Sequence, residues 1–227
     1  MNELRMLRLV RHPCVTQFLG VTALSASNEI ALVLESTHAL SLFPYLTSPS
    51  KVNAPGPDAS ERAWVLRQIC WVVVHLHTHD PPIVHGSLKD SAIAVASCEP
   101  YPKVKLLEFG FAQMRTFSQT RIPGGNSWRY RAPELWQVGP RPAPMPAIDI
   151  FALGGLMFLL ASDKKPFSGT AHDDVFFSVR KGRPVQPNWE EQWLTEGENC
   201  ELPQACMRHN PQDRPSCREV LARVGSM

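Results

Sequence analysis

The most constraining feature of this chain is the stretch 83–110, which reads IVHGSLKDSAIAVASCEPYPKVKLLEFG. It holds short apolar runs, and polar or glycine-containing clusters, HGSLKDS and EFG, adjoin them. Short apolar runs bounded by turn residues are typical of buried strands. The stretch therefore predicts two polar loops that are held at the ends of buried strands.

Composition limits the class of protein. A chain of 227 residues can bury a substantial core and fits one or two domains. The formal net charge is +2 and no basic run dominates, so neither nucleic acid nor an anionic membrane surface is expected as the main partner. The 21 prolines gather between strongly apolar segments, which indicates loops rather than disorder.

Cysteine usage and the chain ends indicate where such a protein resides. The six cysteines show no C-x-x-C pair and no regular spacing, so no disulfides are expected. Charges interrupt the first 13 residues every few positions, unlike a signal peptide. The longest apolar run, 150–161, is too short to span a bilayer. These features predict a soluble intracellular protein, cytoplasmic or nuclear.

Periodicity predicts the main elements outside the central stretch. They are a helix over 2–10, a β-hairpin from 15–23 and 29–35, a helix over 59–77, and an apolar helix beginning at Asp149. Ser60 is the expected N-cap of the helix over 59–77.

The motifs together resemble the eukaryotic protein kinase family, in its tyrosine-kinase-like Ser/Thr group. That family reads His-Arg-Asp-Leu-Lys-x-x-Asn and Asp-Phe-Gly where this chain has HGSLKDSA (85–92) and EFG (108–110). Further landmarks follow in order: Glu3 nine residues before His12, an Ala-Pro-Glu at 132–134, and a late NPQDRPSCREVL with Arg214 placed to pair with Glu134. The resemblance implies an α+β, protein-kinase-like fold. A reduced N-lobe of helix C and two strands (1–35) would precede a mostly helical C-lobe (36–227).

Several positions that react in the family are changed in this chain. Ser87 replaces the catalytic aspartate, Ala92 replaces a metal-binding asparagine, and Glu108 replaces the metal-binding aspartate, whereas Lys89 is retained. A serine is a poor proton acceptor, and proton-transfer catalysis contributes 10²–10⁴-fold, so this change alone costs roughly 3–5 kcal/mol of barrier. Glu108 remains the one candidate metal ligand.

The nucleotide site implied by the resemblance is also incomplete. Glu35 to Thr37 match the hinge that binds adenine, and Ala94 matches the adenine floor. No Gly-rich loop and no lysine strand are present, so Glu3 lacks its family partner. Binding of Mg-ATP is expected to be weak if it occurs. Gly86 stands where many kinases have an arginine that pairs with phosphate, so phosphorylation at Thr116, Ser118, Thr120 or Ser127 would not act through that pair.

Other interpretations of these residues stay open. Ser87 can simply cap a turn, Lys89 can be a solvated surface charge, and Glu108 can pair with Lys103 or Lys105 instead of metal. The run H-x-H-x-H at 75–79 has zinc-like spacing. If the run instead ends a core helix, its later histidines are expected to face solvent.

The sequence thus predicts a catalytically impaired kinase domain that acts as a scaffold or allosteric partner. Expected contacts with protein partners are the exposed end of helix C, the edge of the hairpin and the loop before Glu134. The alternative is an active ATP-dependent Ser/Thr kinase whose upstream N-lobe is missing from this chain. A third possibility is that the chain is a fragment of a longer product.

Overall fold

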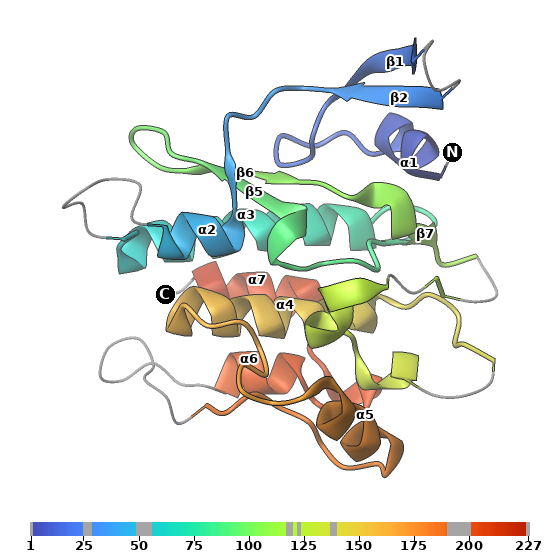
Figure 1. Ribbon diagram of the computed structural model, residues 1–227, viewed down its shortest axis with the longest axis vertical. Coiled ribbons are helices and arrows are strands. Elements are labelled where there is room, and N and C mark those ends of the chain that lie inside the picture. The colour runs from blue at the N-terminus through green and yellow to red at the C-terminus, as the bar shows by residue number, and fades with distance from the viewer. Residues whose placement is uncertain are drawn as a thin grey trace.

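The computed structural model describes residues 2–24, 29–48, 56–116, 120–121, 124–136, 140–189 and 201–225. Helices form the body, and short strands lie at one end of it (Figure 1). The helices are α1 (Asn2–Leu9), α2 (Leu42–Thr47), α3 (Ala59–His77), α4 (Pro146–Ser162), α5 (His172–Arg180), α6 (Glu201–Cys206) and α7 (Cys217–Gly225). The strands are β1 (Phe18–Leu24), β2 (Glu29–Leu34), β3 (Leu40–Ser41), β4 (Ile83–Val84), β5 (Ile93–Ala96), β6 (Lys103–Leu106) and β7 (Gln113–Met114). This is the predicted α+β arrangement, with a small strand-bearing part before a mostly helical one.

Helix α4 is the centre of the helical body. It is apolar on all sides, and its residues from Ile148 to Leu160 are buried, as a helix without a polar face must be. It begins at Pro146, three residues before the predicted start, because proline fits the first helical turn. Helix α6 lies close against it at Gly154, where a Cβ atom would come within 2.6 Å of Met207 Cγ.

Helix α3 spans the predicted residues, but its cap differs from the prediction. The N-cap is Asp58, whose carboxylate accepts the Glu61 N–H, while Glu61 Oε2 accepts the Asp58 N–H. This reciprocal capping box satisfies two helix-end donors. Ser60, the predicted cap, instead donates its hydroxyl to Asp58 Oδ1. The sequence signal was present as Asp58 with Glu61 three residues later.

Three small antiparallel sheets complete the fold. Strands β1 and β2 form the predicted hairpin, β3, β5 and β6 form a sheet in that order, and β4 pairs with β7. The loop 85–92 leads from β4 to β5, and the loop 107–112 leads from β6 to β7. The two polar clusters of the sequence are therefore held between paired strands, as predicted.

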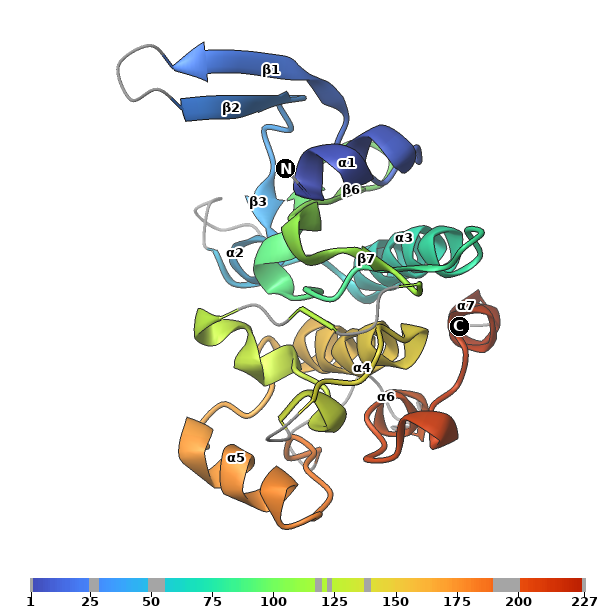
Figure 2. The same ribbon diagram turned by 90° about the vertical axis from the view of Figure 1, so that its right-hand side faces the viewer.

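Helix α1 is anchored to the second of these loops. Met6, Leu7 and Val10 are buried in the same core cluster as Phe109. The Asn2 side-chain nitrogen lies 2.9 Å from both the Gly110 and the Ala112 carbonyl oxygens. Strands β1 and β2 lie farther out, beyond α1 as seen from α4 (Figures 1 and 2).

Helix α4 is the longest apolar helix and so the one to consider as a membrane span. Across the described ranges, no helix combines the length and apolar character that crossing a bilayer needs.

Candidate functional site

The loop 85–92 is fixed by one buried carboxylate from α4. Asp149 accepts the His85 N–H at 2.8 Å and the Gly86 N–H at 2.9 Å, and its Oδ2 lies 2.9 Å from His77 Nε2. Burial opposes ionisation of Asp149, but the contact with His77, the nearby His85 and the Gly86 N–H hold its pKa below the usual value. His77 was expected to face solvent. Its side chain is instead 8% exposed, because Asp149 needs a partner in the core.

The imidazole of His85 links the two loops. Its ring is fully buried, its Nε2 lies 2.9 Å from the Leu107 carbonyl oxygen, and its edge meets Phe109 at a centroid distance of 5.0 Å. Burial lowers the pKa of His85, although the nearby Asp149 opposes this effect. A neutral, packed His85 therefore sets the position of the Glu108–Phe109–Gly110 segment relative to the first loop.

Glu108 is engaged by its neighbours through both carboxylate oxygens. Its backbone adopts the left-handed region with φ of 60°. Its Oε2 lies 2.8 Å from Lys89 Nζ, and its Oε1 accepts the Ser91 hydroxyl at 3.0 Å. The pairing with Lys103 or Lys105 considered from sequence is thus wrong, because Lys89 lies nearer in the folded chain.

These residues do not fit the magnesium ions that the family uses. Mg²⁺ requires near-octahedral oxygen coordination. The two loops 85–92 and 107–112, called the cleft loops below, carry the carboxylates of Glu108 and Asp90, and both are already engaged: Glu108 by Lys89 and Ser91, and Asp90 by Lys165. Ala92 is buried and has no side-chain donor atom. Within the described ranges, no group of three or more His, Cys, Asp or Glu residues could hold a metal ion.

The serine at the catalytic position lies in a closed environment. Ser87 is 4% exposed and borders a cavity of about 20 Å³ that Ser127 also lines. Its Oγ has no hydrogen-bond partner among the described residues. Asp90, the nearest acid in sequence, is turned to Lys165, with 2.8 Å between carboxylate and ammonium.

The predicted nucleotide positions lie along one side of the sheet β3–β5–β6. Glu35 pairs with Lys105 at 2.7 Å and accepts the Gln17 N–H at 2.8 Å. Burial opposes its ionisation, but these bonds keep the pKa of Glu35 below its usual value. Thr37 is half-buried in the connection to β3, and Ala94 on β5 is only 5% exposed. None of these side chains carries a positive charge that could neutralise a phosphate.

The predicted pair between the Ala-Pro-Glu segment and the last part of the chain is formed. Arg214 donates to both oxygens of Glu134 at 2.8 Å, and to the carbonyls of Ala147, Arg208 and His209. Its side chain is fully buried, and five bonds use the five N–H groups of the guanidinium.

The segment between Gly110 and Glu134 is fixed at some of the predicted phosphorylation positions. Thr120 is buried and donates its hydroxyl to the Pro142 carbonyl, and Ser127 donates to the Gly124 carbonyl, each at 2.9 Å. Thr116 is exposed, and Ser118 lies outside the described residues.

The three histidines with zinc-like spacing contact three different groups. His75 packs its ring 5.1 Å from that of His12, His77 pairs with Asp149, and His79 Nδ1 lies 3.0 Å from the Pro81 carbonyl oxygen. His75 and His77 are two residues apart on α3 and so lie on different faces of it, and His79 follows the end of the helix, so the spacing does not produce a shared site.

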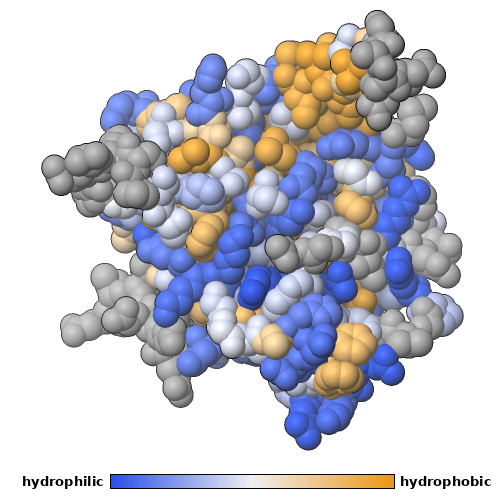
Figure 3. Space-filling model, in the orientation of Figure 1, coloured by the Kyte–Doolittle hydropathy of each residue, from blue (hydrophilic) through white to orange (hydrophobic). Residues whose placement is uncertain are grey.

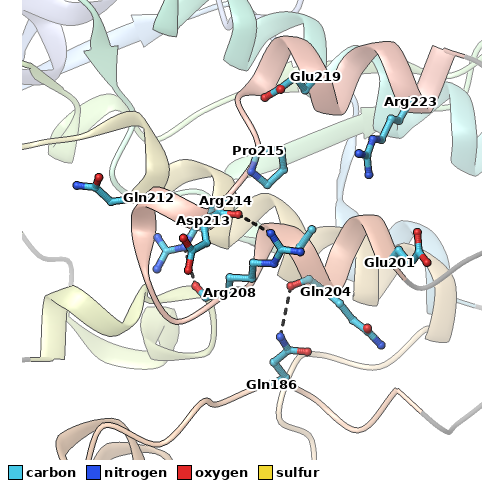
Figure 4. A pocket seen from close by; sticks show the side chains of 11 residues that line it. Gln186, Glu201, Gln204, Arg208, Gln212, Asp213, Arg214, Pro215, Glu219 and Arg223 are labelled. Carbon is cyan, nitrogen blue, oxygen red and sulfur yellow. Dashed lines mark hydrogen bonds between the residues drawn. The ribbon is translucent and has the colours of Figure 1, made fainter.

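A polar pocket that the sequence did not predict lies between α6 and α7, with a volume of about 780 Å³ (Figure 4). Arg208 donates to the Asp213 carbonyl across it, and Gln186 donates to the Gln204 carbonyl. Its lining carries both signs of charge and shares no residue with the two cleft loops. It therefore indicates no particular ligand.

Comparison with known proteins identifies the family. Residues 1–224 match the protein kinase domain, so the chain belongs to the protein kinase domain family. It is 26% identical over 188 residues to a sucrose non-fermenting protein kinase 1 of Fusarium virguliforme, covering 83% of this chain and 25% of that protein. It is 25% identical over 221 residues to the serine/threonine-protein kinase ATG1a of Arabidopsis thaliana, covering 97% and 33%. It is 28% identical over 224 residues to the mouse serine/threonine-protein kinase WNK3, covering 97% and 12%.

The chain thus spans a third or less of the length of these relatives. The matches bear out the predicted protein kinase resemblance and the kinase-like fold with its reduced strand-bearing part.

Proposed function

We propose that this kinase domain has lost phosphoryl transfer and acts by binding other proteins, as a scaffold or allosteric partner. One observation carries the proposal: both oxygens of Glu108 are engaged, by Lys89 and by Ser91. Phosphoryl transfer relies on cations that neutralise the phosphates. In this cleft the carboxylate that would hold such a cation is neutralised by a lysine of the same site.

The residues in and next to the acceptor position support the same function. Ser87 has a hydroxyl where the family has a carboxylate, and the adjacent acid, Asp90, is held by Lys165. Without a carboxylate, proton removal loses a contribution of roughly 3–5 kcal/mol.

The proposal includes the finer classification made from sequence. The runs PPIVH, AIAV and VKLL resemble the strands that hold the catalytic loop in the tyrosine-kinase-like Ser/Thr group, and they favour that group. The six cysteines show no C-x-x-C pair and no regular spacing, which favours reduced thiols in an intracellular protein.

The surfaces proposed for protein partners are the outer face of α1, the hairpin of β1 and β2, and the loop before Glu134. Arg5 and Arg8 are exposed on α1 while Met6 and Leu7 are buried, so this helix has an outward face that is free for contact. Deleting 1–35 would expose core residues, so surface substitutions such as Arg5→Glu with Arg8→Glu test this better than truncation.

Thermal unfolding with about millimolar ligand tests the loss of nucleotide binding, since a ligand of the folded state raises stability by RT ln(1 + [L]/Kd). We expect no shift of the melting temperature with Mg²⁺-ATP, with ATP and EDTA, or with Mg²⁺ alone. A shift with Mg²⁺-ATP that disappears in Glu108→Ala would contradict the proposal, because it would show that Glu108 releases Lys89 to hold metal.

The second candidate is an active Ser/Thr kinase that requires an N-lobe absent from this chain. The intact support of both loops by Asp149 and His85 favours it, because the cleft backbone is built even though its side chains differ. A triple variant that restores the family residues, Ser87→Asp, Ala92→Asn and Glu108→Asp, distinguishes the two candidate functions. Activity with a generic protein substrate after restoration would place the defect in the loops. Continued inactivity together with continued failure to bind Mg²⁺-ATP would place it in the missing strands.

A further inference from the structure

A concave pocket of about 560 Å³ adjoins the last turn of α5 and shares no residue with the cleft loops. It is bordered by the Ala-Pro-Glu segment, the end of α5 and the segment 209–211. Its apolar lining comes from Pro133, Trp136, Val179 and Pro211. Concave sites with an apolar lining and a few polar groups are typical of binding sites. The pocket can therefore accept an apolar side chain of a partner.

Aromatic side chains connect this pocket to the outer surface of α5. The ring of Trp136 lies 6.0 Å from that of Phe176, and Phe176 meets Phe177 edge-on at a centroid distance of 5.4 Å. Phe177 is 57% exposed. Figure 3 shows a small apolar area over α5, among hydrophilic side chains. Exposed aromatic residues are enriched where proteins bind one another.

Three exposed cations lie beside the pocket, at the end of α5. Arg180 lines the pocket, and Lys181 and Arg183 flank Gly182, which also lines it. The Arg180 guanidinium lies 5.5 Å from the Phe176 ring centroid. None of the ion pairs between described residues includes any of these three cations. Cations without acidic neighbours attract a partner of opposite charge.

The acidic residues of this region do not offset these cations. Glu134 is the acid in the described lining of the pocket, and Arg214 already binds both of its carboxylate oxygens. Asp173 and Asp174 lie in the first turn of α5, at the opposite end of the helix from the pocket. Asp213 lines the separate polar pocket between α6 and α7. The surface therefore combines an apolar pocket with a positive rim.

We propose that this α5 surface, made of the pocket, Phe176, Phe177 and the cations at 180–183, binds an acidic segment of a partner protein. One apolar side chain of that segment would fill the pocket, and its carboxylates would face the cations. A second copy of this chain fits less well, because a two-fold contact brings the same cations together. The proposal goes beyond the loss of phosphoryl transfer and does not depend on it.

NMR titration of the isotopically labelled full chain, without nucleotide, tests the proposal with a short synthetic peptide that has two leucines among glutamates. We expect shifts of the Trp136 indole N–H signal and of the α5 backbone amides, and weaker binding as salt is added. One matched peptide carries lysines in place of the glutamates, and another carries serines in place of the leucines. Each should bind at least about tenfold more weakly.

A charge-reversal variant tests the same surface from the side of the protein. Lys181→Glu with Arg183→Glu should weaken binding of the glutamate peptide at least about tenfold. Lys103→Glu with Arg218→Glu is the matched control, because both residues are exposed, neither lies on α5, and the change in net charge is the same. The control should leave the affinity within about twofold of the parent chain.

Any of four results would overturn the proposal. They are no shift at about millimolar glutamate peptide, equal binding of the lysine peptide, equal binding of the serine peptide, and equal weakening by the α5 variant and its control. Far-ultraviolet circular dichroism of each variant confirms that folding is intact. Because no nucleotide is present, these failures are separate from failure of the proposed function, which would appear as Mg²⁺-ATP binding or phosphoryl transfer.

Discussion

Buried charges beneath the cleft and polar side chains within it differ in how completely they are bonded. Beneath it, Arg214 uses every N–H group and Asp149 accepts from two backbone donors while contacting His77. In the cleft loops, the Ser87 hydroxyl has no partner among the described residues. The carboxylate of Glu108 has both oxygens engaged but is 38% exposed.

The difference separates the residues that maintain the fold from those that would perform chemistry. A buried charge without partners costs several kcal/mol, so a folded chain must satisfy groups such as Arg214. An exposed carboxylate such as that of Glu108, and a buried hydroxyl without a bond such as that of Ser87, contribute little to stability and can be exchanged without unfolding the chain. A chain can therefore keep a kinase fold while its reacting positions change.

The largest expected effect comes from removing the most completely bonded group. Arg214→Met leaves the Glu134 carboxylate, which is 10% exposed, without its cation. Breaking a buried ion pair from one side costs about 3–5 kcal/mol. The measurement is the free energy of unfolding from urea denaturation at pH 7.

Arg62→Met is the control for this change. Arg62 also binds a carboxylate, that of Asp163, with two hydrogen bonds, but Asp163 is 44% exposed. Its loss should cost about 1–2 kcal/mol, because water replaces the partner of Asp163. Equal losses in the two variants would mean that burial does not distinguish these pairs.

Asp149→Asn should be the next most damaging change. One amide oxygen cannot replace both carboxylate oxygens, so donors from His85, Gly86 or His77 lose their acceptor. We expect a loss of about 2–4 kcal/mol in the same denaturation experiment. Asp173→Asn, at a side chain 79% exposed, should change stability by less than about 0.5 kcal/mol. A small loss at Asp149 would show that the first loop is held by other contacts.

The sequence predicted these anchors better than it predicted the cleft. Hydrophobic periodicity gave α3, α4 and the hairpin, because burial of apolar faces determines those elements. The pair of Arg214 with Glu134 followed from family motifs whose spacing fixes their place in the fold.

The partners of Lys89 and His77 were not predictable in the same way. The sequence does not distinguish Lys89, Lys103 and Lys105 as partners of Glu108. Only the folded loops bring Lys89 Nζ to 2.8 Å from Glu108 Oε2. His77 was expected in solvent because nothing local reveals that α3 ends beside Asp149, 72 residues later. Side-chain pairing between distant loops depends on packing that a local pattern does not contain.

His12 is intermediate between the fully bonded buried charges and the unbonded Ser87 hydroxyl, because its ring is partly buried and forms one hydrogen bond. Its Nδ1 accepts the Cys14 N–H at 3.0 Å, so this nitrogen carries no proton. Burial, His75 on α3 and Lys105 on β6 lower its pKa below the ordinary value of 6.5. The unfolded chain then binds more protons, so stability from His12 is complete above pH 6.5 and is lost as pH falls through the folded-state pKa.

His12→Asn tests this dependence. The Asn side-chain oxygen can accept the same N–H two residues on and does not titrate. We expect the free energy of unfolding at pH 7.5 to change little. The decrease between pH 7 and 5 should be smaller than in the parent chain. An identical pH profile in both chains would show that His12 does not contribute.

The smallest expected effect is at Ser87, and it tests the comparison from the cleft side. Ser87 and Ser127 line the same cavity of about 20 Å³, and both are buried. The Ser127 hydroxyl donates to the Gly124 carbonyl, whereas the Ser87 hydroxyl has no partner among the described residues. Ser127→Ala should therefore cost about 1 kcal/mol of unfolding free energy, and Ser87→Ala should change it by less than about 0.5 kcal/mol or raise it.

A cavity of that size can hold one water molecule, which gives the Ser87 measurement a second use. If Ser87→Ala costs as much as Ser127→Ala, the hydroxyl is bonded through solvent and the cleft is as fully satisfied as the anchors below it. The difference in bonding between the buried charges below the cleft and the residues within it would then not hold at Ser87, the catalytic position. If Ser87→Ala is neutral, the residue at the catalytic position contributes neither a base nor stability, as expected where phosphoryl transfer has been lost.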